Sequence, residues 1–199
     1  MNATLTPPRP APSPLPRRLL TAADLAVFPD DLPSGSVRYE LNDGRIVIHW
    51  PPTDLHSRSQ ALVCVALSRY ADSRDSGITL ASVGIVVRRN PDRVVGADAA
   101  FILAASLPAR RSAEGYLETI PELVVEVRSR NDWAPEIAAK CDEYFRAGVR
   151  VVWVIDPDAR VVAAHNADGS VQLFRDADPL TCDLLPGFAV PVANLFAGS

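Results

Sequence analysis

Two carboxylates interrupt stretches of the chain that otherwise have the apolar character of buried strands. Asp98 has apolar or small residues on both sides, and Glu126 stands within a run rich in valine. Burying an ionised carboxylate is costly unless another group compensates its charge. A divalent cation bound by both side chains would compensate both, because hard cations prefer oxygen ligands. The alternative is that each carboxylate lies at a strand end and pairs with an arginine, such as Arg93 or Arg128.

Lys140 is the only lysine in the sequence. The chain has 20 lysine and arginine residues in total, and all the others are arginines. Lysine is a compact point charge that can contact one water or one phosphate oxygen, whereas arginine is a planar fork. On a helix that turns about 100° per residue, Lys140 lies at the edge of an apolar stripe containing Tyr144, from which it can reach Glu126. Two alternatives stay open: an ordinary surface lysine, and an i,i+4 ion pair with Glu136.

Periodicity, caps and turns predict the elements that must position these side chains. Helices are predicted over residues 22–28, over 54–71 with Asp54 as the N-cap, and over 135–147. The turn Asn42-Asp43-Gly44 tolerates positive φ and predicts a hairpin between strands 37–41 and 45–50. Further strands are predicted over residues 78–87, 94–103, 122–127, 151–155, 161–164, 171–174 and 184–190. A mixed sheet with two main helices makes this an α/β protein.

Length and composition indicate one folded domain after an N-terminal tail. The chain has 199 residues, a net charge of −4 and 48% hydrophobic residues, values typical of soluble proteins. Residues 1–18 are rich in proline and arginine, and we expect a disordered tail there and a single domain over residues 19–199. The three cysteines are widely separated, as is typical of a reducing compartment. We see neither an apolar run long enough for a membrane span nor a signal core, and we therefore expect a cytoplasmic protein. The acidic balance excludes a basic protein that coats DNA.

The ordered set of motifs resembles the Uma2 family of restriction-endonuclease-like proteins, within the PD-(D/E)xK nuclease superfamily. The resemblance extends from about Thr21 to Phe196. Its segments are Tyr39-Glu40-Leu41-Asn42-Asp43-Gly44-Arg45-Ile46, His56, Ala97-Asp98-Ala99-Ala100-Phe101, Pro121-Glu122-Leu123-Val124-Val125-Glu126-Val127-Arg128-Ser129, Lys140-Cys141-Asp142-Glu143-Tyr144-Phe145-Arg146-Ala147-Gly148-Val149 and Val152-Trp153-Val154-Ile155-Asp156-Pro157.

The resemblance implies a role for each matching polar residue. Asp98 and Glu126 would be ligands of Mg²⁺ or Mn²⁺. Lys140 would take the place of the superfamily's motif lysine, moved from the strand to the helix. Glu40 would lie beside the metal ions or their waters, and His56 would contact the substrate or support a ligand.

Three positions depart from the family pattern. Arg128 stands where the superfamily's usual E-x-K has its lysine. Ala97 replaces the proline that usually precedes the aspartate, and Ser129-Arg130 replaces the usual Ser-Pro. Neither of the last two changes removes a chemical group, but each can alter the geometry at a strand end.

The resemblance therefore implies a restriction-endonuclease-like mixed sheet flanked by helices, with additional C-terminal strands. The implied activity is a metal-dependent endonuclease that hydrolyses phosphodiesters of nucleic acid, DNA in particular. Arginine clusters could contact phosphates, either Arg88, Arg89 and Arg93 or Arg110 and Arg111. A homodimer is expected by analogy, since paired cuts need two sites, and no membrane partner is expected.

Two other classes of function remain open. The first is a catalytically inactive nuclease fold that serves as a binding or dimerisation module. The second is a metal-dependent hydrolase of small phosphate esters. Divalent-metal binding at Asp98 and Glu126 separates the endonuclease from the inactive module, and activity on esters but not on polymers would identify the second class.

Overall fold

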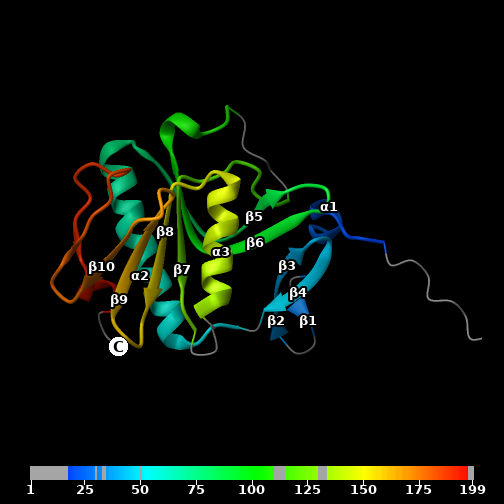
Figure 1. Ribbon diagram of the computed structural model, residues 1–199, viewed down its shortest axis with the longest axis horizontal. Coiled ribbons are helices and arrows are strands. Elements are labelled where there is room, and N and C mark those ends of the chain that lie inside the picture. Colours follow the sequence, from blue (N-terminus) through cyan, green and yellow to red (C-terminus); the bar gives the residue numbers. More distant parts are fainter. Residues whose placement is uncertain are drawn as a thin grey trace, which may run out of the picture.

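An eight-stranded mixed sheet with one long helix on each face dominates the computed structural model (Figure 1). The structure describes residues 18–29, 31–32, 35–49, 51–109, 115–129 and 134–196. The predicted tail, except Arg18, and the predicted phosphate contacts of Arg110 and Arg111 lie outside these residues. Within the described part of the chain, no helix is long and apolar enough to cross a membrane.

The helices are α1 (Ala22–Leu25), α2 (Asp54–Arg74) and α3 (Ala134–Ala147), with short 3₁₀ turns η1 (Ala104–Ser106) and η2 (Val192–Phe196). The strands are β1 (Asp31–Leu32), β2 (Gly35–Ser36), β3 (Arg38–Asn42), β4 (Arg45–His49), β5 (Gly77–Arg88), β6 (Arg93–Leu103), β7 (Leu123–Val127), β8 (Val151–Asp156), β9 (Val161–Asn166), β10 (Val171–Arg175), β11 (Pro179–Leu180) and β12 (Val190–Pro191).

The main sheet has the strand order β10-β9-β8-β7-β6-β3-β4, and β5 also pairs with β6. β7 and β8 run parallel and are linked through α3, whereas the other pairs in this sheet are antiparallel. The predicted mixed α/β sheet is therefore confirmed. The two predicted C-terminal strands, β9 and β10, extend it beyond β8.

The two long helices cover opposite faces of this sheet. Leu67 of α2 packs in one core cluster with Val125 and Trp153, and Tyr144 of α3 packs in another with Val124. Figure 1 shows α3 in front of the strands and α2 behind them. Because side chains alternate along a strand, Val124 and Val125 of β7 face different helices. The following Glu126 therefore points to the α3 face.

One edge of β6 is shared by two strands, and this leaves a gap in the sheet. Residues 99–101 of β6 pair with β7, and Val94 pairs with Leu41 of β3. Between these contacts, residues 95–97 pair with β5 on one side and with no described strand on the other, and the register of Cα partners with β5 skips Asp98. Buried main-chain groups need partners, so side chains must supply the hydrogen bonds in this gap.

Of two predictions at the ends of elements, the hairpin turn after β3 is correct, and the N-cap of α2 is shifted by one residue. The hairpin turn is confirmed, with Asp43 at φ 52° and Gly44 at φ 70°. The N-cap of α2 is Thr53 rather than Asp54, since the Thr53 side chain accepts the hydrogen bond of the His56 backbone N–H. Threonine and aspartate can both accept a hydrogen bond from a backbone N–H in the first turn of a helix. Because Thr53 and Asp54 are adjacent, the sequence alone does not decide which of them is the N-cap.

The predicted strand over residues 184–190 is wrong. This segment consists mostly of turns, and only Val190 belongs to a strand, the short β12 that pairs with β11. Leu185 and Phe188 are nevertheless buried in the core on the α2 face. Their apolar pattern reflects burial beneath a turn, which periodicity alone cannot distinguish from a strand.

Candidate active site

Asp98 closes the gap between β6 and β7 with its own side chain. The last pair of this ladder joins Ala99 to Val125, so Asp98 and Glu126 are the next residues on either side of the opening. Asp98 is buried, and its Oδ2 accepts a hydrogen bond from the Val127 backbone N–H at 2.8 Å. The carboxylate thus takes the place of the strand carbonyl that would otherwise pair with Val127.

Two further side chains contact Asp98. His56 Nε2 at the start of α2 lies 3.1 Å from Oδ2, and the Arg38 guanidinium donates to Oδ1 at 3.3 and 3.4 Å. Burial opposes ionisation of Asp98, but the hydrogen bonds from His56 and Val127 hold the pKa of its carboxyl below the usual value. An arginine therefore does pair with Asp98, although it is neither Arg93 nor Arg128.

Glu126 is held by two residues of α3. Lys140 Nζ donates to Oε2 at 2.7 Å, and the Tyr144 hydroxyl donates to Oε1 at 2.6 Å. Desolvation raises the pKa of Glu126 to about 7; Lys140 lowers it, but burial together with nearby Asp98 outweighs that effect. The ion pairs of Lys140 within the described residues are with Glu126 and Glu40 rather than with Glu136.

Lys140 and Glu40 also satisfy the exposed main chain of the gap. Lys140 Nζ donates to the Gly96 carbonyl oxygen at 2.8 Å, and the Gly96 N–H donates to Glu40 Oε1 at 2.9 Å. A Cβ at position 96 would lie 3.3 Å from Glu40 Oε1, so glycine permits this close approach. The sequence therefore brings all four of its predicted acidic and lysine site residues to one opening of the sheet.

The electrostatic surroundings set opposite charges on Glu40 and Lys140. Burial opposes ionisation of Glu40, but His49, Lys140 and the Gly96 N–H lower its pKa to about 2. Burial also disfavours charge on Lys140, yet Glu126 and Glu40 hold its pKa above the usual value. Lys140 is therefore a permanent cation 3.7 Å from Glu40 Oε1.

The sequence does not predict how Glu40 and Glu126 are anchored, although it offers Arg93 as a possible partner of a strand carboxylate. Arg93 is buried and donates to Glu40 at 3.3 Å, and its Nε donates to both carboxylate oxygens of Glu143 on α3. Tyr144 was expected only as part of an apolar stripe. No local pattern could reveal the Arg93 contacts, because they join residues about fifty positions apart in the chain.

Three other arginines named from the sequence pair with acidic side chains outside the gap. Arg88 pairs with Asp43, and Arg89 pairs with Asp92 and Glu118. Arg128 donates to Asp156 at 2.6 Å. None of these pairs brings an arginine to Glu126.

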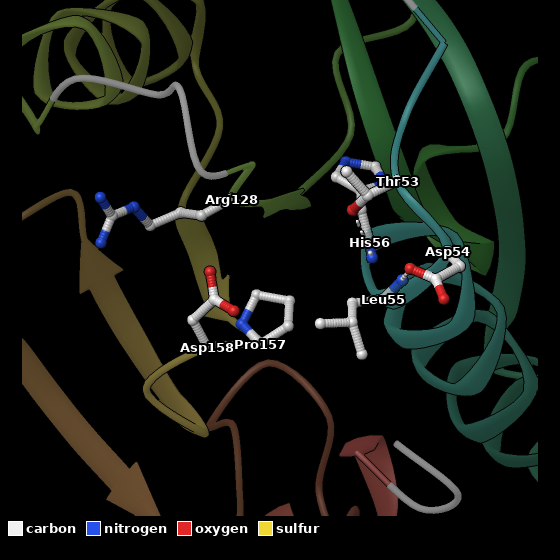
Figure 2. Close-up of a pocket in the computed structure, with 7 residues that line it drawn as sticks. All are labelled: Thr53, Asp54, Leu55, His56, Arg128, Pro157 and Asp158. Atoms are coloured by element: carbon white, nitrogen blue, oxygen red, sulfur yellow. Dashed lines mark hydrogen bonds between the residues drawn. The ribbon is translucent and has the colours of Figure 1, made fainter.

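Asp98, Glu126 and Glu40 form an acidic cluster at the gap. His56 contacts Asp98 of this cluster and also lines a neighbouring cavity of about 190 Å³. The cavity lies between the N-terminal turn of α2 and the segments that follow β7 and β8 (Figure 2). Its lining residues are Thr53, Asp54, Leu55, His56, Arg128, Pro157 and Asp158. The Nδ1 atom of His56 is buried without a hydrogen-bond partner among the described residues, while Nε2 contacts Asp98.

The oxygen donors at the gap suit a hard cation that keeps much of its water. In the described part of the chain, no three His, Cys, Asp or Glu side chains are arranged to hold a metal ion. Asp98 and Glu126 supply carboxylates from adjacent strands. Mg²⁺ is usually bound by one or two carboxylates together with water and substrate phosphates rather than by an all-protein cage. Two carboxylates at an opening therefore fit such an ion.

Comparison with known proteins adds independent information on family and fold. The Uma2 family model, described as "Putative restriction endonuclease", matches residues 26–193. The structure is similar to the crystal structure of "a putative nuclease belonging to DUF820" from Anabaena variabilis, with a TM-score of 0.70 and 16% sequence identity over 89% of this chain and 97% of that chain. No curated protein matches the chain.

Proposed function

Because the chain belongs to the Uma2 family of restriction-endonuclease-like proteins, we propose that it is a metal-dependent endonuclease that hydrolyses phosphodiesters in DNA. The observation that carries this proposal is the contact between Lys140 Nζ and Glu126, made beside Asp98 at the gap in the sheet. A cation on a helix that contacts the carboxylates of Glu126 and Glu40 is an arrangement that can stabilise charge on a phosphate.

In this proposal Asp98 and Glu126 hold Mg²⁺ or Mn²⁺. The bound ion would lower the pKa of a water molecule and neutralise charge that develops on the phosphate. Val127 and His56 fix the Asp98 carboxylate, and Tyr144 fixes that of Glu126. These contacts orient both side chains before a substrate arrives, which reduces the reorganisation needed during reaction.

Lys140 would act as a hydrogen-bond donor rather than as a base. Its pKa is raised by Glu126 and Glu40, so the ammonium group keeps its proton at neutral pH. A charged donor at this point can orient a water molecule or stabilise negative charge on a phosphate oxygen. Glu40, whose pKa is about 2, stays ionised and balances this positive charge.

The neighbouring His56 has a supporting role in this scheme. Asp98 is ionised, so His56 Nε2 carries the proton that is shared with Oδ2. Its Nδ1 is buried and has no hydrogen-bond partner among the described residues. His56 thus orients Asp98 through its contact with Oδ2.

One observation favours a second candidate, a catalytically inactive nuclease fold that binds a partner or forms a dimer. Protein groups alone already compensate the buried carboxylates, since Lys140 and Tyr144 contact Glu126 while His56 and Arg38 contact Asp98. A purely structural cluster would need no metal ion. Homodimerisation remains an expectation by analogy for either candidate.

Cleavage assays distinguish the two candidates. Supercoiled plasmid and single-stranded DNA are incubated with the protein in Mg²⁺, Mn²⁺ or EDTA. The endonuclease predicts metal-dependent nicking that Glu126→Gln reduces at least about 100-fold, since this charge acts on the reacting groups. The matched variant Glu136→Gln changes an exposed carboxylate of the same helix and should cleave normally. Absence of cleavage together with absence of metal binding by calorimetry would favour the inactive module.

A further inference from the structure

Two basic side chains stand at the mouth of the acidic cluster, and sequence reasoning singled out neither. Arg38 and His49 are directly opposed Cα partners in the β3–β4 hairpin, so both project from the same face as Glu40. Their side chains are 39% and 45% exposed, whereas those of Asp98 and Glu40 are below 10%. They therefore form the solvent-facing rim of a site whose carboxylates are buried.

Arg38 is held only loosely at Asp98. Both of its terminal nitrogens approach the same oxygen, Oδ1, at 3.3 and 3.4 Å. Strong charge-assisted hydrogen bonds are shorter, at about 2.7–2.9 Å. The other oxygen of Asp98 is already bound by His56 and by the Val127 N–H. Asp98 can therefore remain buried and ionised when Arg38 turns toward another anion.

His49 makes a similarly loose contact. Its Nε2 lies 3.4 Å from Glu40 Oε1, an oxygen that already accepts the Gly96 N–H at 2.9 Å. Glu40 also contacts Arg93 through its second oxygen. The position of Glu40 thus depends on buried groups, and His49 is available to interact with a ligand at the surface.

The charge balance of the interior favours basic side chains at the rim for binding of an anionic substrate. Four carboxylates meet there, and two buried or half-buried cations, Lys140 and Arg93, lie among them. The carboxylates are those of Glu40, Asp98, Glu126 and Glu143. In the metal-free protein this negative charge repels a phosphate, and a positive group at the entrance offsets that repulsion.

We propose that Arg38 and His49 form a phosphate-binding rim that receives the backbone of nucleic acid at this site. The inference rests on the proposed endonuclease function and adds the residues that contact the substrate. Arg38 presents two parallel N–H groups that match two oxygens of one phosphodiester, and His49 presents a single ring donor beside it. The hairpin then holds the nucleic acid against the opening that contains Asp98 and Glu126.

The test is equilibrium binding of labelled single-stranded and double-stranded DNA in EDTA, which prevents cleavage, between 50 and 200 mM salt. Variants are Arg38→Gln, Arg38→Lys and His49→Gln. Arg146→Gln is the control, because Arg146 is 75% exposed on α3 and pairs with Asp142 within its own helix. We expect Arg38→Gln to weaken binding about tenfold and to lower the slope of log Kd against log salt by about 0.7–0.9, the value for one lost phosphate contact.

Arg38→Lys should retain most of the salt slope because it keeps the charge, and His49→Gln should weaken binding about threefold. The melting temperature of each variant is measured to show that the fold is intact. An affinity and salt slope of Arg38→Gln equal to those of wild type would overturn the phosphate-binding rim, as would absence of DNA binding by wild type. Plasmid cleavage by the same wild-type preparation in Mg²⁺ separates failure of the rim alone from failure of the proposed function.

Discussion

Lys140 on α3 crosses the gap in the sheet and donates one hydrogen bond to the Gly96 carbonyl oxygen, at 2.8 Å. The same ammonium group donates to Glu126 at 2.7 Å. It therefore connects the edge of β6 to β7 where the two strands no longer pair. Lys140 therefore stabilises the fold by bridging β6 and β7, in addition to its proposed role in catalysis.

This double contact predicts that Lys140→Ala destabilises the protein by about 2–3 kcal/mol, since a part-buried carbonyl and a part-buried carboxylate both lose a partner. Urea unfolding of the metal-free protein measures the loss. Arg146→Ala removes an exposed i,i+4 pair with Asp142 and should change stability by less than about 0.5 kcal/mol. A loss below 1 kcal/mol for Lys140→Ala would show that the bridge contributes little.

The raised pKa of Glu126 predicts a pH dependence of stability in EDTA. Its folded pKa of about 7 lies above the usual 4.5, so the folded state retains a proton that the unfolded state has lost. The stability that Glu126 contributes is complete below pH 4.5 and disappears as the pH rises through 7, a loss of about 3 kcal/mol.

The measurement compares wild type with Glu126→Gln, whose amide cannot ionise. The free energy of unfolding of wild type, relative to that of the variant, should fall between pH 5 and pH 8. A constant difference over this range would mean that Lys140 keeps Glu126 ionised throughout.

Tyr144 offers a matched test of side-chain positioning. Tyr144→Phe removes the hydroxyl that holds Glu126 Oε1, and we expect kcat for DNA cleavage to fall about tenfold with little change in KM. Tyr70→Phe removes a comparable hydrogen bond, to the Pro186 carbonyl oxygen, on the α2 side of the sheet. Each variant should cost roughly 1 kcal/mol of stability. Equal cleavage rates in the two variants would show that the Tyr144 hydroxyl does not position Glu126 for catalysis.

Metal binding should stabilise the folded protein through Asp98. At about 100 times its dissociation constant, Mn²⁺ is expected to add roughly 2.7 kcal/mol to the free energy of unfolding. Asp98→Asn should abolish this increase, whereas Asp72→Asn, at an exposed position on α2, should retain it. An Mn²⁺ effect that survives Asp98→Asn would place the ion elsewhere.

The sequence predicts the core of this site better than its surroundings. The carboxylates on apolar strands and the edge position of Lys140 are local features, and the structure brings these side chains together. Glu40 and His56 came from the family resemblance alone. Their positions depend on the β3–β4 hairpin meeting β6 and on α2 beginning beside Asp98, which are long-range contacts.

The partners of the carboxylates could not be predicted for the same reason. Which of the many arginines reaches Asp98 is decided by the pairing of distant strands, and Arg38 is sixty residues away in the chain. The capping threonine of α2 and the buried turns over residues 184–190 show a second limit. Apolar and polar patterns report burial and local hydrogen bonding, and two backbone conformations can satisfy the same pattern.

Single-turnover cleavage of plasmid DNA by wild type and Lys140→Gln, at a temperature where unfolding curves show both to be folded, tests the central claim most directly. The account predicts cleavage by wild type that EDTA abolishes, a loss of at least about 100-fold in Lys140→Gln, and normal cleavage by Arg146→Gln. Cleavage by Lys140→Gln at the wild-type rate, or wild-type cleavage that persists in EDTA, would contradict a metal-dependent centre built from Asp98, Glu126 and Lys140.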